Sequence, residues 1–134
     1  MTVRALPCLP SFRRQLLYAT LERAFRTTRR EDFRIVNFSV QDHHLNLLVE
    51  ADTKDALARG MTSFSDRANR LINAAMGRRR GRVWADRYHR RDLTSPRQVR
   101  HALVYCLHNY KKHLGVTDAD PRIDGCSSAR WFRG

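Results

Sequence analysis

Two strand-like segments that follow one another closely, Phe33 to Val40 and Leu45 to Val49, constrain the fold of this chain most strongly. The first alternates and is rich in Phe, Val and Ile, and the second repeats this signal after the turn-like Gln41-Asp42. Strands joined by so short a turn pair in antiparallel fashion, because a parallel pair needs a long crossover connection. The sequence therefore predicts two adjacent antiparallel strands.

Three segments carry apolar residues at intervals of three and four, which is the pattern of an amphipathic helix. Ser11, Asp52 and Ser95 are the expected N-caps, since a short polar side chain can accept a hydrogen bond from the first turn of a helix. Proline suits the first helical position after Ser95, because its missing N–H costs no hydrogen bond there. The expected helices run from Ser11 to about Arg30, from Asp52 to just before Gly77, and from Pro96 to His113.

Two weaker strand signals complete the order of elements. They cover Met1 to Leu6 and Val83 to Tyr88, and charged residues break the alternation of the second. The order strand, helix, strand, strand, helix, strand, helix predicts an α+β fold, ferredoxin-like, with helices packed on an antiparallel sheet. With 134 residues the chain is expected to form a single domain, residues 1–134, whose tail, residues 115–134, packs on or near it.

The charge of the chain indicates a polyanionic partner. Lys and Arg number 26 against 13 Asp and Glu, a formal net charge of +13, and so strong a positive field concentrates nucleic acid. An anionic membrane is the rival partner, but no stretch approaches the roughly 18 apolar residues of a spanning helix, and no signal peptide follows Met1. We expect a cytoplasmic protein that binds nucleic acid and no membrane. Cys8, Cys106 and Cys126 are widely separated and are expected to be free thiols.

The second strand begins with side chains that can bind a metal. Residues i and i+2 of a strand point to the same face, so His44 and Asn46 share one face and every second residue from Leu45 to Val49, all of them apolar, shares the other. The apolar set can enter the core, which leaves an imidazole and an amide about 7 Å apart at Cα on the opposite face. His43 points away from them. Such a pair can bind one divalent ion, or it can belong to a solvated sheet face.

One tyrosine lies off the expected buried face of the last helix. At about 100° per residue, Tyr105 lies roughly 140° from the centre of the apolar stripe, with His101 one turn earlier and Asn109 one turn later on the same side. Tyr105 can be an amphipathic ring along a helix flank, or a nucleophile whose phenol, with a usual pKa of about 10, reacts at a metal-bound phosphate. The stripe consists of Val99, Ala102, Leu103, Cys106, Leu107 and Tyr110.

Four blocks of sequence carry a resemblance to a known family. They are FRIVNFSVQDHHLNLLVEA, GRVWADRYHRRDL, ALVYCLHNYKKH and the terminal CSSARWF. Together they resemble the REP-associated tyrosine transposases, small members of the HUH superfamily of single-strand DNA transposases. The likeness extends from about Val3 to Phe132, and the order and spacing of the blocks make it more specific than any single motif.

The resemblance implies a site built from a strand and a later helix. In the family, a His-hydrophobic-His motif on a central strand holds a divalent metal, and a catalytic tyrosine lies on the helix. His44 and Leu45 match the first two motif positions, Tyr105 matches the nucleophile, and Asn109 matches a position from which relatives supply a further polar ligand. Asn46 replaces the second histidine, and its oxygen suits Mg²⁺ or Mn²⁺ but binds softer metals less well than imidazole does. Weakened metal binding is therefore expected.

The resemblance also implies single-stranded or hairpin DNA from repetitive extragenic palindromes as the substrate. The ion held by His44 and Asn46, with Asn109 as a further candidate ligand, would polarise a phosphodiester, and Tyr105 would attack phosphorus to give a 5′-phosphotyrosine and a free 3′-hydroxyl. Two alternatives stay open: a catalytically impaired, domesticated protein that binds DNA hairpins, and a more weakly supported RNA-binding α+β domain. The sequence is compatible with a monomer or a homodimer.

Basic residues between the second and third helices are the expected DNA contacts. Their guanidinium groups would bind phosphates, and aromatic rings among them can stack on unpaired bases. Trp84 is equally consistent with a core residue, whereas Trp131 and Phe132 are expected to pack against the domain. Tyr88 is a rival nucleophile that its strand-like surroundings disfavour. The expected DNA-binding residues are Arg78, Arg79, Arg80, Arg82, Arg87, Arg90 and Arg91.

Overall fold

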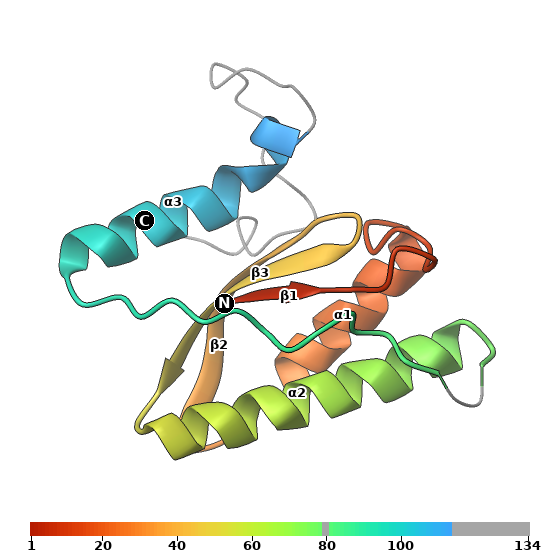
Figure 1. Cartoon of the computed structure of the whole chain (residues 1–134), viewed down its shortest axis with the longest axis horizontal. Coiled ribbons are helices and arrows are strands. Elements are labelled where there is room, and N and C mark those ends of the chain that lie inside the picture. The colour runs from red at the N-terminus through yellow and green to blue at the C-terminus, as the bar shows by residue number, and fades with distance from the viewer. Residues whose placement is uncertain (79–80, 114–134) are drawn as a thin grey trace.

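An antiparallel sheet with helices on both faces forms the centre of the molecule (Figure 1). The computed structural model describes residues 1–78 and 81–113, with side chains described as far as Tyr105. Helices α1 and α2 pack together on one face, and α3 lies across β2 and β3 on the other. The elements are β1 (Thr2–Arg4), α1 (Gln15–Thr27), β2 (Phe33–Val40), β3 (His44–Ala51), α2 (Lys54–Ala75) and α3 (Pro96–His113).

The sheet has the order β1-β3-β2, with β3 in the middle. Both pairings of β3 are antiparallel, and the β2–β3 register runs from Phe33 opposite Ala51 to Val40 opposite Leu45, with an irregularity between Ile35 and Asn37. The predicted α+β class is therefore confirmed. The two adjacent central strands are where the alternation placed them.

The strand expected over Val83 to Tyr88 is not a regular strand. This segment runs antiparallel to β1, but it meets β1 only in isolated bridges, Ala5 with Trp84 and Thr2 with His89. More residues separate the two bridges on this segment than on β1, so an even hydrogen-bond ladder cannot form between them. Hydrogen bonds still fix it in the place of a fourth strand, among them Ala85 N–H to Arg4 O at 2.8 Å and Thr2 N–H to His89 O at 2.9 Å.

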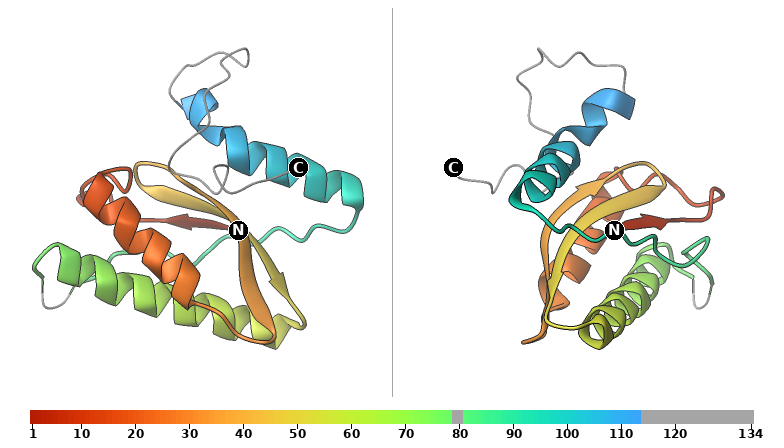
Figure 2. Two further views of the ribbon diagram at one scale, coloured as in Figure 1. Left: turned by 180° about the vertical axis from the view of Figure 1, so that it is seen from behind. Right: turned by 60° about the vertical axis from the view of Figure 1, so that its left-hand side comes forward.

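The hydrophobic core lies between the sheet and the layer formed by α1 and α2 (Figure 2). From β3 it takes Leu45 and Leu47, which are 0% and 4% exposed, as the alternation predicted. Phe64 of α2 lies at its centre, with its ring centroid 5.4 Å from that of Phe25 and 6.3 Å from that of Trp84. Burial of these apolar side chains holds the helices to the sheet.

Two of the three expected helix caps are wrong. Ser11 lies outside α1, because its hydroxyl bonds to Asp42 Oδ1 at 2.5 Å and so ties this turn to the β2–β3 turn. Asp52 precedes the true cap of α2, Thr53, whose hydroxyl accepts a hydrogen bond from Ala56 N–H. Ser95 caps α3 as predicted, accepting a hydrogen bond from Gln98 N–H at 3.2 Å.

The face of α3 that was expected to be buried is only partly covered. Val99 is 41% exposed, whereas Ala102 and Leu103 are half-buried. The stripe prediction is therefore wrong at Val99, because α3 lies over the polar face of the sheet rather than against the core. The side chains of Cys106, Leu107 and Tyr110 lie outside the described residues.

Replacing Gly60 with Ala is expected to destabilise the protein by about 1–3 kcal/mol, the usual range for an overpacked core. Gly60 is buried in α2, and an added Cβ would lie 2.1 Å from Cγ of Phe33, a ring that is 1% exposed. Chemical denaturation measures the change. In a Phe33→Leu background, adding Gly60→Ala should lower the free energy of unfolding by less than it does in the wild type. A Gly60→Ala protein of unchanged stability would contradict the packing.

Candidate nucleic-acid site

The sheet face beneath α3, here called the polar face, carries buried polar side chains besides Leu48, in contrast to the apolar face beneath α1 and α2. Four polar side chains on this face are at most 9% exposed, and Gln41 Nε2 donates a hydrogen bond to Ser39 Oγ at 2.8 Å. Burying polar groups is costly unless they find partners, so such a face is poorly suited to a core. The four residues are Asn37, Ser39, Gln41 and Asn46.

His44 and Asn46 begin β3 on this polar face. Asn46 is 9% exposed, and its Oδ1 accepts a hydrogen bond from Thr2 Oγ1 at 3.3 Å. His44 is half-buried and lies opposite Arg4 of β1. His43 points away from them, as expected, and its Nε2 lies 2.7 Å from Leu9 O.

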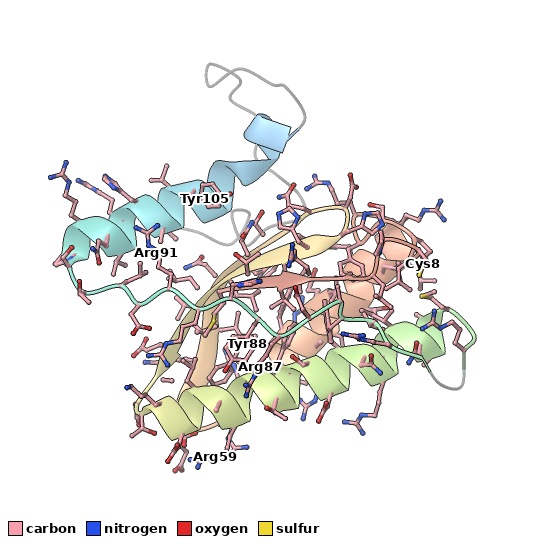
Figure 3. All side chains as sticks on the ribbon, in the orientation of Figure 1. Cys8, Arg59, Arg87, Tyr88, Arg91 and Tyr105 are labelled. Atoms are coloured by element: carbon pink, nitrogen blue, oxygen red, sulfur yellow. The ribbon has the colours of Figure 1, made fainter. Side chains whose placement is uncertain are left out.

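A groove of about 1280 Å³ lies between this face and α3. Asn46 lines it from the sheet, and His101 and Tyr105 line it from α3. Tyr105 is 48% exposed, and Figure 3 shows its ring on α3. The structure thus brings Asn46 and Tyr105 to one groove. His44 does not line it, and the side chain of Asn109 lies outside the described residues.

The rival nucleophile Tyr88 lies on the opposite side of the sheet from Tyr105. Its ring packs against the hydrophobic core, and it does not line the groove. Trp84, whose role the sequence left open, also packs with the core. Its ring centroid lies 5.8 Å from that of Phe12, and its Nε1–H donates to Ser65 O at 3.1 Å.

The predicted DNA-binding arginines follow the connection from α2 to α3 rather than forming one cluster. In the first part of this connection, the loop that follows α2, Arg82 Nε–H donates to Trp84 O at 2.8 Å. Arg78 is half-buried against the same loop. Two asparagines of α2 anchor this loop, Asn69 and Asn73, whose amides both donate to Gly81 O, at 3.2 and 3.0 Å. Arg79 and Arg80 lie outside the described residues.

The later arginines approach the groove. Arg90 and Arg91 line it, whereas Arg87 is exposed farther back along the segment (Figure 3). Asp92 binds both Nε and Nη2 of Arg90, at 2.6 and 2.8 Å. This hydrogen-bonded pair lowers the pKa of the Asp92 carboxyl below its usual value. Arg91 makes no ion pair with any other described residue, so its guanidinium is available to an anion.

The donor set of the site is poor in charged metal ligands. Over the described side chains, no three His, Cys, Asp or Glu residues lie close enough together to hold a metal ion.

Cys8 is exposed and free, whereas the side chains of Cys106 and Cys126 lie outside the described part, as do Trp131 and Phe132. No helix in the described part is both long and apolar enough to span a membrane.

Two residues around the polar face were not singled out from the sequence: Thr2 and Arg4. Thr2 and Arg4 alternate along β1 with Val3 and Ala5, which are 2% and 6% exposed. That alternation was the available signal, but five residues are too short a pattern to fix a face. His89 lines the groove and pairs with Thr2 through the backbone.

Comparisons with known proteins show a likeness in fold. No protein-family model matches the sequence, and no curated protein matches it. A solved structure described as a REP-associated tyrosine transposase bound to a REP hairpin is similar, with a TM-score of 0.70 and 18% sequence identity. The match covers 97% of this chain and 74% of that one. This protein therefore has the fold of a REP-associated tyrosine transposase.

Proposed function

We propose that this protein binds hairpin DNA and cleaves and rejoins its single-stranded flank, with Tyr105 as the nucleophile. The observation that carries the proposal is the groove that Asn46 of β3 and Tyr105 of α3 line together. The fold it shares with a hairpin-bound transposase supports the choice of DNA, and so does the net charge of +13.

The proposed reaction is a transesterification at phosphorus. The phenolic oxygen of Tyr105 attacks a phosphodiester, so that a tyrosine–phosphorus bond forms and the bond to the 3′ oxygen breaks. The phenol loses its proton, and the departing 3′ oxygen gains one from solvent. The products are a 5′-phosphotyrosine and a free 3′-hydroxyl, and attack by another 3′-hydroxyl reverses the step and joins strands. Tyr105 is 48% exposed, as a group that must reach a polymer substrate should be.

His44 and Asn46 fit a divalent ion of the hard type. Mg²⁺ and Mn²⁺ accept oxygen ligands and retain waters, so an amide oxygen and one imidazole on the same strand face are a sufficient protein contribution when phosphate supplies the rest. Thr2 Oγ1 holds Asn46 Oδ1 in place at 3.3 Å. When bound, such an ion supplies Lewis-acid polarisation of the phosphodiester. Asn109 is the proposed third ligand.

The substitution Asn46→His should tighten Mn²⁺ binding severalfold, because imidazole is a better donor than an amide for transition metals. Asn46 lines the groove, so the larger ring has space on that side. Isothermal titration calorimetry of the purified protein measures the change. His44→Asn in the Asn46→His protein should cancel the gain, and an unchanged affinity in the single variant would count against Asn46 as a ligand.

A second candidate function is hairpin binding without catalysis. The observation that favours it is Asn46 itself, since an amide at this position weakens the proposed metal site. Labelled hairpin DNA incubated with the protein and Mn²⁺ or Mg²⁺ separates the two functions on a denaturing gel. A covalent adduct supports strand transfer, whereas tight binding with no adduct under either metal supports the binding protein.

A further inference from the structure

Arg4 places a cation beside the proposed metal ligands. β1 pairs with β3 so that Arg4 lies directly opposite His44, and Thr2 lies opposite Asn46. Directly opposed residues of an antiparallel pair point to the same face, with Cβ atoms about 5 Å apart. Val3 is 2% exposed in the core on the other face, so Arg4 must share the face of His44.

We propose that Arg4 binds the scissile phosphate of single-stranded DNA next to His44, and that Asp86 is the positioning residue that holds its guanidinium. This role rests on the strand transfer proposed above. The Arg4 side chain is 57% exposed, so it is open to a ligand beside His44; neither of the two lines the groove, but their neighbours Thr2 and Asn46 do. Arginine suits this task because its planar fork donates several hydrogen bonds to phosphate oxygens and is always charged.

Asp86 is fixed relative to Arg4 by both backbone and side chain. Ala85 N–H donates to Arg4 O at 2.8 Å, and Asp86 Oδ2 pairs with Arg4 Nη2. His89 Nε2 lies 3.9 Å from the same carboxylate oxygen. The carboxylate engages one edge of the guanidinium, and the remaining N–H groups of Arg4 can face a phosphate. An oriented donor of this kind stabilises the charge that grows on phosphate oxygens in the transition state.

Single-turnover cleavage tests the role. Protein in excess over a labelled REP hairpin with single-stranded flanks, in Mn²⁺, gives the rate of adduct formation, and fluorescence anisotropy in the Tyr105→Phe background gives hairpin affinity. Arg4→Ala should lower the rate by about 10²–10³-fold, as the loss of one oriented donor does elsewhere, with a far smaller change in affinity. Arg4→Lys should recover part of the rate, and Asp86→Asn should lower it less than Arg4→Ala.

Arg34→Ala is the matched control. Arg34 of β2 is 66% exposed and forms an ion pair at 2.9 Å with Glu50, which lies at the other end of β3 from His44. The two substitutions remove the same charge, and exposed pairs contribute little to stability, so both variants should fold. Arg34→Ala should form adduct at the wild-type rate.

Other outcomes would overturn either the role of Arg4 or the strand transfer itself. A wild-type rate in Arg4→Ala overturns the role of Arg4 and leaves the strand transfer standing. An equal fall in Arg34→Ala, or a fall in affinity as large as the fall in rate, also overturns it, because the effect would then be general electrostatic attraction. A wild-type protein that forms no adduct overturns the strand transfer, and the role of Arg4 falls with it.

Discussion

Replacing Tyr105 with Phe is expected to abolish the covalent protein–DNA adduct while leaving hairpin affinity and thermal stability unchanged. The substitution removes only the phenolic oxygen, which is the atom that would form the bond to phosphorus. No other group of the side chain can take its place in a transesterification. Because Tyr105 is 48% exposed on α3, the loss of its hydroxyl should not disturb the core. Denaturing gels of labelled hairpin DNA measure the adduct, and anisotropy measures the binding.

Tyr88→Phe is the control for this result. Its ring packs against the core rather than lining the groove, so the variant should form adduct at the wild-type rate. An adduct that survives Tyr105→Phe but disappears in Tyr88→Phe would show that Tyr88, and not Tyr105, is the nucleophile. An adduct that survives in both would mean that neither tyrosine is the nucleophile.

Phe64→Ala is expected to lower the free energy of unfolding by about 3–5 kcal/mol, the usual loss for a fully buried phenylalanine. Phe64 is 0% exposed, and its ring stacks 5.4 Å from Phe25 and lies 6.3 Å from Trp84. It therefore joins α1, α2 and the segment beside β1 in a single cluster. The cavity left by the ring would loosen contacts of all three at once. Urea denaturation followed by circular dichroism measures the loss.

Leu16→Ala is the matched control on α1, because Leu16 is 61% exposed. Surface substitutions of this kind usually change stability by less than about 0.5 kcal/mol. A Phe64→Ala protein as stable as Leu16→Ala would contradict the placement of Phe64 at the centre of the core. A large loss in Leu16→Ala would show instead that the exposed face of α1 is covered in solution.

The regular elements were predictable where a long periodic pattern sets the burial of one face. β2 has the predicted bounds, Phe33–Val40, and α3 has the predicted bounds, Pro96–His113. Serine followed by proline specifies a helix start locally, so the cap at Ser95 was also correct. The caps at Ser11 and Asp52 were not, because the Ser11 hydroxyl bonds to Asp42, 31 residues away, and Thr53 competes as the adjacent cap of α2.

The candidate site was predictable only in part. Alternation in β3 and helical spacing in α3 were enough to predict which way Asn46 and Tyr105 project, and both line one groove. Their meeting depends on α3 crossing the polar face of the sheet, which no local pattern specifies. Arg4 was not singled out because its position beside His44 depends on the pairing of β1 with a strand 40 residues later in the chain.

By itself, the sequence determined the α+β class, the bounds of β2 and α3 and a formal net charge of +13, because periodicity and net charge are properties of the chain alone. Only the tertiary structure decided that the fourth strand is irregular, that Trp84 and Tyr88 pack with the core, and that α3 covers a polar face. These features depend on pairing registers and on competition between distant hydrogen-bond partners. Such contacts exist only once segments far apart in the sequence are brought side by side.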